Sequence, residues 1–237
     1  MSTPHEPLGR PTETIEIQNL VIERFCVGRH RVNTYLVATA ARRSAILIDP
    51  GAEAPTLQAG VRAMGACLHT IALTHAHWDH VGAAQELSDM FEIPVYVQSR
   101  DRPLLRLAPV YALRVDGVRF RAPSRVITWD EHASIDIGDG HQLEMRAAPG
   151  HTPGGAVLGL GPVVFTGDTL LNRSVGRTDL PGGSRQALDQ SLEDLAGRLT
   201  TAVWVCPGHG APWPARDAIE WLASRSPSET HTIHDDA

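Results

Sequence analysis

Short apolar runs of strand length recur along the chain in two batches, and this pattern limits the folds that it can adopt. The runs of the first batch cover residues 15–25, 32–37, 45–48, 68–74 and 93–97, and those of the second cover residues 134–137, 142–147, 156–160, 163–166 and 202–205. Helical patterns, and no long linker, accompany both batches. Because each sheet must bury an apolar face, the sequence predicts an α/β domain with two packed sheets and helices outside.

Four segments show a helical pattern. We expect helices at residues 55–64, 81–91 and 214–223, and another that begins after Ser184, where leucines recur at spacings of four, three and four. The polar ends of the chain indicate a flexible arm at residues 1–14 and a flexible tail at residues 224–237, with the single domain at 15–223.

The stretch between residues 100 and 125 shows neither helical nor strand periodicity, so we expect it to be irregular. It contains seven arginines: Arg100, Arg102, Arg106, Arg114, Arg119, Arg121 and Arg125. A solvated face is the favoured interpretation. The alternative is that one or two of them meet an anionic substrate, because arginine suits carboxylate recognition.

Composition excludes several classes of function. The chain contains no lysine, which excludes Schiff-base chemistry and a lysine-assisted phosphate loop. A net charge of −6 disfavours nucleic-acid binding. No apolar run is long enough to cross a membrane and the N-terminus does not resemble a secretory signal, so we expect a cytoplasmic protein. Its three cysteines are too few for a disulfide framework, and we expect Cys26 and Cys67 to be buried thiols.

A cluster of metal-ligating residues follows a predicted buried strand. His75, His77, Asp79 and His80 occur within six consecutive positions. Alternate residues on an extended segment point the same way, so the first two can bind one ion while the next two face a second. Imidazole and carboxylate together suit zinc, iron or manganese. A fortuitous polar loop is disfavoured, because polar groups beside an apolar strand need partners.

Three further polar residues follow later strands: His151, Asp168 and His209. Each alone would be weak, since a lone histidine or aspartate in a turn is usually structural. Together they form a pattern, because each comes at the C-terminal end of a strand, where loops gather at one rim. We therefore expect all seven side chains to meet.

These motifs resemble the metallo-β-lactamase superfamily, and within it the glyoxalase II-like branch. The matching segments are His75-Ala-His77-Trp-Asp79-His80, Gly150-His151-Thr-Pro-Gly, Thr166-Gly-Asp168-Thr, Gly176-Arg177-Thr-Asp179 and Pro207-Gly-His209-Gly, with Asn33-Thr-Tyr-Leu and Ile48-Asp49-Pro-Gly upstream. The resemblance covers nearly all of the chain except its two ends. It implies a four-layer αββα sandwich with the metal site at one edge.

The resemblance also implies the roles of the residues. His75, His77 and His151 would bind a first divalent ion, Asp79, His80 and His209 a second, and Asp168 would bridge them; zinc is the metal that we expect. Asp79 and Asp168 would be the catalytic carboxylates of a hydrolase that uses a metal-bridging hydroxide on a small-molecule, anionic thioester. The oligomeric state is not predicted.

Three supporting residues remain open at this point. Asp49 either orients a ligand histidine or simply begins the Asp-Pro-Gly turn. Arg177 and Asp179 are expected to form a structural pair, with substrate contact by Arg177 as the alternative. Trp78 suits either a pocket wall or the core.

The sequence also departs from longer glyoxalase II enzymes, whose helical C-terminal domain helps to bind glutathione. We do not expect that domain here, so the resemblance does not extend to glutathione recognition. The main alternative function is a persulfide dioxygenase with one iron on His75, His151 and Asp168, a two-histidine, one-carboxylate triad. Other hydrolases of the superfamily, such as lactonases, are further alternatives.

Overall fold

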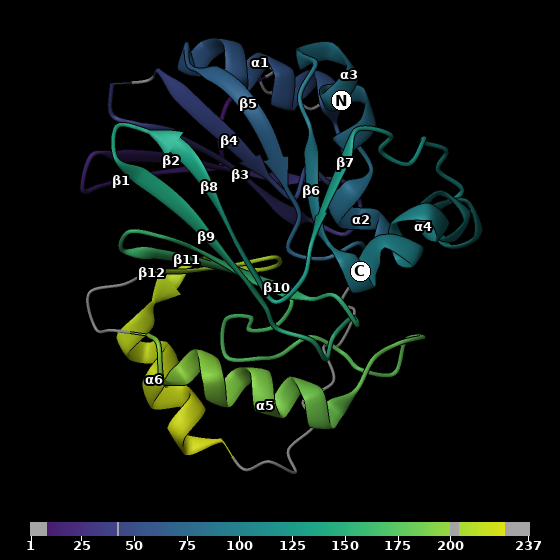
Figure 1. Cartoon of the computed structure of the whole chain (residues 1–237), viewed down its shortest axis with the longest axis vertical. Helices are drawn as coiled ribbons and strands as arrows, with labels where there is room; N and C mark the ends of the chain where they lie inside the picture. Colours follow the sequence, from purple (N-terminus) through teal and green to yellow (C-terminus); the bar gives the residue numbers. More distant parts are fainter. Residues whose placement is uncertain (1–8, 42, 200–203, 226–237) are drawn as a thin grey trace, which may run out of the picture.

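Two β-sheets pack against each other in the computed structural model, which describes residues 9–41, 43–199 and 204–225 (Figure 1). The first sheet contains, in spatial order, β1 (Glu13–Ile17), β2 (Leu20–Val27), β3 (Val32–Thr39), β4 (Ser44–Ile48), β5 (Cys67–Ala72), β6 (Val95–Gln98) and β7 (Val126–Trp129). The second contains β8 (His132–Gly138), β9 (His141–Ala147), β10 (Ala156–Leu160), β11 (Val163–Gly167), β12 (Trp204–Pro207) and β13 (Trp213–Pro214), also in spatial order.

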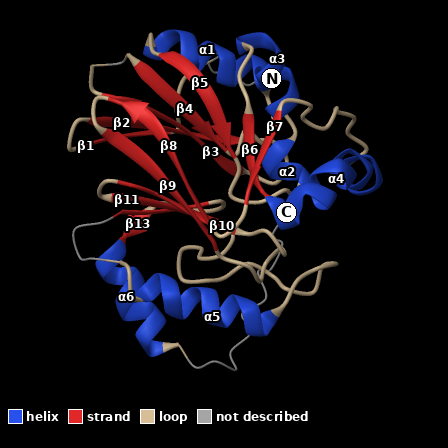
Figure 2. Cartoon of the chain, viewed as in Figure 1, coloured by secondary structure: helices blue, strands red, loops and turns tan. Residues whose placement is uncertain are grey.

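Helices cover the outer faces of both sheets, as Figure 2 shows by colour. Those over the first sheet are α1 (Ala54–Met64), α2 (Trp78–Val81), α3 (Ala84–Phe91) and α4 (Arg102–Val115), and those over the second are α5 (Arg185–Ala196) and α6 (Ala215–Ser224). Three apolar layers result: one under each set of helices and one between the sheets. The expected αββα sandwich is confirmed.

Burial follows from this layering. Every residue of β3 is buried, because helices cover one face of this central strand and the second sheet covers the other. In β8, at the edge of the second sheet, Ile135 and Ile137 point inward between exposed neighbours. An alternating apolar pattern therefore marks an edge strand such as β8, and a continuous apolar run marks a central strand such as β3.

Strand direction brings the ends of several strands to one edge of the sandwich. β4, β5, β6 and β7 run parallel to one another in the first sheet, and β11 runs parallel to β12 in the second. The backbone amide of Asn33 donates to the carbonyl of Gly208 and joins the two sheets there. Loops that follow parallel strands consequently meet at this edge.

Some predicted elements were wrong in detail. Residues 15–25 form a hairpin rather than one strand, because Gln18 and Asn19 adopt positive φ angles of 45° and 64° and reverse the chain. The helix expected at 81–91 begins only at Ala84, as α3, and a separate short helix, α2, precedes it at Trp78–Val81. The strand predicted at 202–205 is observed from Trp204 onward, and residues 202 and 203 lie outside the described part.

The arginine-rich stretch contains a helix, α4, and is followed by β7, neither of which was predicted. Pro103 and Pro109 and the many arginines obscure the periodicity of α4. Its buried residues are few and small except for one leucine: Leu105, Ala108 and Ala112. Packing of α4 against α2 outweighs the helix-breaking effect of an internal proline.

The division into arm, domain and tail stays a prediction. Residues 1–8 and 226–237 lie outside the described part, and Glu13 and Thr14 already belong to β1. Among the helices of the described part, none is long and apolar enough to cross a membrane.

Candidate metal centre

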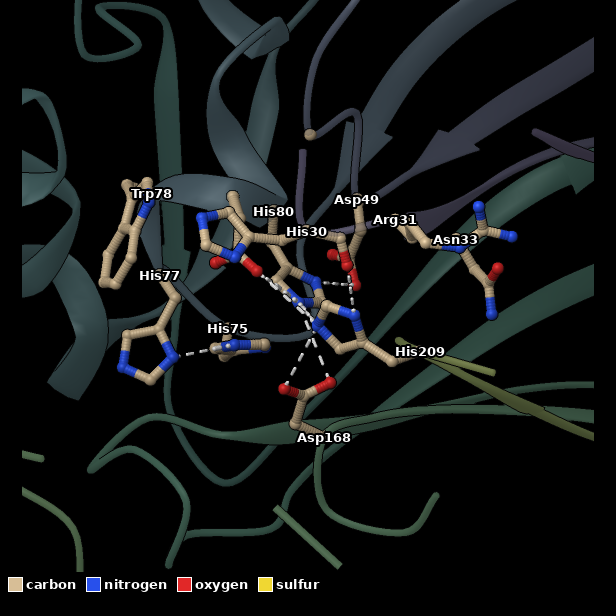
Figure 3. Close-up of polar contacts among 12 residues, drawn as sticks. His30, Arg31, Asn33, Asp49, His75, His77, Trp78, His80, Asp168 and His209 are labelled. Carbon is tan, nitrogen blue, oxygen red and sulfur yellow. Dashed lines mark hydrogen bonds and ion pairs between the residues drawn. The ribbon is translucent and has the colours of Figure 1, made fainter. Parts of the chain in front are cut away.

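The seven predicted ligands lie together at the shared edge of the two sheets. Figure 3 labels His75, His77, His80, Asp168 and His209 among them. The loop and short helix after β5 carry His75, His77, Asp79 and His80. The loops after β9, β11 and β12 carry the other three residues, His151, Asp168 and His209. Ligands from both sheets thus converge, as expected from the strand ends.

Three histidines form the first group, His75, His77 and His151, all of them buried. Nδ1 of His77 lies 3.1 Å from Nε2 of His75 and 2.9 Å from Nε2 of His151. Nitrogen ligands of one tetrahedral zinc would be about 3.3 Å apart. The spacing therefore suits three ligands of a single ion.

The electrostatics of this first group favour neutral imidazoles. Burial, together with neighbouring histidines, lowers the pKa of His75 well below its usual value. Burial and His151 lower the pKa of His77 to about 3. Neutral imidazole is the form that coordinates a metal, so both side chains stand ready as ligands.

The second group consists of Asp79, His80 and His209. The two Nε2 atoms lie 3.3 Å apart, and Oδ2 of Asp79 lies 3.5 Å from Nε2 of His209 and 3.8 Å from that of His80. Burial alone would lower the pKa of His80, but Asp79, Asp168 and Asp49 raise it to about 10. This group therefore attracts positive charge, either a proton or a cation.

Asp168 lies between the two groups. Its Oδ2 is 3.4 Å from Nε2 of His151 and 3.6 Å from that of His209, and its Oδ1 is 3.7 Å from Nε2 of His80. Oδ1 is buried and has no hydrogen-bond partner among the described residues. A Cβ at position 208 would collide with this oxygen, so only glycine fits there. A buried carboxylate oxygen without a partner, facing imidazoles, is what a cation would satisfy.

The outer nitrogens of two candidate ligand histidines are also engaged. Nδ1 of His151 donates to the carbonyl of Arg177 at 2.7 Å, and Nδ1 of His209 donates to the carbonyl of His30 at 3.0 Å. A carbonyl can only accept, so each Nδ1 carries the hydrogen and each Nε2 keeps its lone pair for a metal.

Asp49 serves both purposes that the sequence left open. It has a positive φ of 49° at the turn, and its Oδ2 lies 3.0 Å from Nδ1 of His80. Its Oδ1 accepts from the backbone amide of Thr74 at 2.8 Å. Asp49 therefore orients His80 as well as opening the turn.

Asp101 was not predicted, although it connects two ligand loops. This buried carboxylate accepts from the amide of Ala76 at 2.8 Å, from Oγ1 of Thr152 at 2.9 Å and from the amide of Gly154 at 2.6 Å. Burial raises its pKa, although these three donors oppose the shift. Its one sequence signal is its place just after β6, at the same edge as the other strand ends.

A second unpredicted carboxylate, Asp116, lies at the end of α4. Its oxygens lie 2.8 Å and 2.9 Å from Nε2 of His30, and Oδ2 accepts from the indole nitrogen of Trp78 at 2.7 Å. Trp78 also stacks on Tyr111 of α4, with ring centroids 6.1 Å apart. Trp78 thus belongs to a wall beside the metal centre.

The remaining predicted residues have structural surroundings. Arg177 forms a two-pronged pair with Asp179, with both contacts at 2.7 Å, which confirms the expected structural pair. All seven arginines between residues 100 and 125 are exposed, as the favoured interpretation required. The expectation of buried thiols was wrong for Cys67, which is exposed at the start of β5, and Cys26 is only partly buried.

Comparison with known proteins agrees with this geometry. The family model of the metallo-β-lactamase superfamily matches residues 27–209, so the chain belongs to that superfamily. Hydroxyacylglutathione hydrolase GloC of Haemophilus influenzae is 33% identical over 174 residues, covering 71% of this chain and 81% of GloC, in agreement with the glyoxalase II-like resemblance.

Two other relatives extend the comparison. An uncharacterised protein of Mycobacterium tuberculosis is 37% identical over 205 residues, covering 81% of this chain and 91% of that protein. A crystal structure of TTHA1623 in a di-iron-bound form is 36% identical with a TM-score of 0.73, covering 83% of this chain and 96% of that one. A similar chain therefore binds two metal ions.

Proposed function

We propose that this protein is a dinuclear metallohydrolase that cleaves a small-molecule thioester. Membership of the superfamily makes it a metal-binding enzyme, and the similarity to GloC supports thioester hydrolysis. The observation that carries the proposal is the position of Asp168, whose unpartnered, buried Oδ1 and second oxygen lie within 3.7 Å of histidines from both groups.

In this proposal seven residues bind two divalent cations. His75, His77 and His151 would hold the first, Asp79, His80 and His209 the second, and Asp168 would contact both. When bound, two such cations activate water at neutral pH and polarise a carbonyl. The reaction adds water across the C–S bond and releases a carboxylic acid and a thiol.

In this proposal the carboxylates of Asp79 and Asp168 supply the negative charge that holds the two cations. Burial alone would raise both pKa values, but His80 and His209 lower them, so both groups stay ionised. They can thus bind cations and accept a hydrogen bond from the attacking water. No thiol competes for this role at the site, because burial raises the pKa of Cys206 far above its usual value.

A mononuclear iron dioxygenase is the second candidate. It is favoured by one contact, the 3.4 Å between Oδ2 of Asp168 and Nε2 of His151, since these residues and His75 could form an iron triad. The second group would then be unoccupied. Metal stoichiometry therefore separates the two functions.

The test is metal analysis of the purified protein, followed by thioester-hydrolysis and oxygen-uptake assays on the same sample. We expect two equivalents of a divalent metal, zinc above all, with thioester turnover and no oxygen consumption. One equivalent of iron with oxygen uptake on a persulfide would replace the proposal with the dioxygenase. Bound metal without turnover in either assay would refute both.

A further inference from the structure

A cavity of about 160 Å³ lies beside Asp79, between α4 and the turn that joins β2 to β3. Its apolar lining consists of Val27, Val32, Ala52, Ala112, Val118 and Phe120. These six residues come from three stretches of the chain, and residues 27–32 and 112–120 also contribute polar side chains to the wall, those of Arg29, His30 and Asp116.

The polar side chains of the cavity wall already have partners. Asp116 contacts His30 and the indole nitrogen of Trp78, at 2.8 Å and 2.7 Å. Nη1 of Arg29 lies 4.0 Å from Oδ1 of Asp116, and 77% of the Arg29 side chain is exposed. The negative charge of Asp116 is thus compensated within the wall, and the cavity offers an entering group mainly apolar surface. Its chemistry fits a hydrocarbon group better than a hydroxyl or a carboxylate.

The cavity adjoins the second ligand group. Asp79 lines it, and Oδ2 of Asp79 lies 3.5 Å from Nε2 of His209. His30 lines it as well, and its carbonyl accepts from Nδ1 of His209. Figure 3 shows Trp78 on the opposite side of the histidine cluster from Asp168. A carbonyl bound at the metal centre would therefore be within reach of an apolar pocket.

We propose that this cavity is the subsite for the acyl chain of the thioester, and that it selects an apolar chain of about four to six carbons. The size follows from the volume, since an apolar cavity of about 150 Å³ accommodates benzene. This inference rests on the proposed thioester hydrolysis. It adds that Ala112 and Phe120 set the chain length.

The first test compares chain-length selectivity in metal-loaded variants, with acetyl, hexanoyl and octanoyl thioesters of N-acetylcysteamine as probes. Ala112→Leu fills the cavity and should lower the hexanoyl-to-acetyl ratio of kcat/KM by at least about tenfold. Phe120→Ala enlarges it and should raise the octanoyl-to-hexanoyl ratio several-fold. Ala108→Val is the control, because it adds volume to the same buried face of α4 without lining the cavity, and should leave both ratios unchanged.

The second test measures binding without turnover. Methyl resonances of Val27 and Val32 should shift when pentan-1-ol is added to the metal-loaded protein, and Ala112→Leu should abolish the shifts. Thioester turnover with the same chain-length profile in Ala112→Leu as in the parent would overturn the subsite while leaving the hydrolase intact. Absence of all thioester turnover would instead remove the proposed function and the acyl assignment with it, even if pentan-1-ol binds. Absence of the shifts would show that the cavity does not take apolar groups.

Discussion

The two ligand groups differ in charge and in exposure, although they lie side by side. His75, His77 and His151 are nearly inaccessible and form a set of three imidazoles. In the second group, 26% of the His209 side chain and 16% of that of Asp79 are exposed, and the group includes a carboxylate. The buried group is thus suited to retaining a metal, and the second group, whose Asp79 and His209 are partly exposed, to exchanging ligands and meeting substrate.

The largest effect is expected where the two groups meet. Asp168→Ala should remove both metals and lower thioester kcat/KM by at least about a hundredfold while the fold survives, because each group loses its shared carboxylate. Metal analysis and circular dichroism measure the two outcomes. Asp194→Ala, on the exposed face of α5, is the matched control. Normal turnover in Asp168→Ala would refute the bridging role.

Separate substitutions should distinguish the groups. We expect His209→Ala to retain about one equivalent of metal, since the buried trio is intact, and His151→Ala to retain less, because the tighter group is broken. Elemental analysis after dialysis against a weak chelator gives the comparison. Equal losses in the two variants would mean that the groups do not differ in retention.

Metal binding should depend on pH more strongly in the second group, which contains His80. Without metal, neighbouring carboxylates raise the pKa of His80 to about 10, so a cation must displace its proton at neutral pH. The pKa of His77 is about 3, so protons do not compete there. Lowering the pH from about 8 to about 5.5 should therefore release the metal ion of the His80 group before the metal ion of the His77 group. Titration calorimetry in buffers of different ionisation enthalpy should detect proton release for the second ion, and a proton count of zero would contradict this assignment.

A smaller effect is expected from the carboxylate that supports the buried group. Asp101→Asn keeps the shape but weakens acceptance from Ala76, Thr152 and Gly154, and should lower metal affinity or activity by about 10- to 100-fold. If Asp101 acts only by positioning the two loops that carry candidate ligands, excess metal should restore most of the activity of the variant. Asp130→Asn, near the end of β7, is the control. Unchanged affinity with lost activity would argue that Asp101 acts otherwise.

The sequence predicted the layers of the fold and the convergence of the seven candidate ligands for the same reason. Local signals mark the strand ends, such as Asp49 before Pro50 or His151 after Gly150. Because these strand ends meet at one edge of the sandwich, the signals alone were enough to predict that the side chains beside them converge. Asp101 carries only the signal of its place after β6, and its partners Ala76, Thr152 and Gly154 lie in loops that meet only in the fold. Asp116 meets its partners His30 and Trp78 only when α4 packs beside α2. The helix itself was missed, since Pro109 interrupts the pattern from which a helix is predicted.

The candidate ligands come from both sheets, which bears on how the chain unfolds. A cation held by His75 and His151 would join segments that are far apart in sequence, and so would cross-link the two sheets reversibly. The sheets could not separate without breaking coordination bonds. Chelation should therefore accelerate opening of the sandwich at its metal edge, where hydrogen bonds such as those from Asn33 and Tyr35 to the carbonyl of Pro207 would still join the sheets.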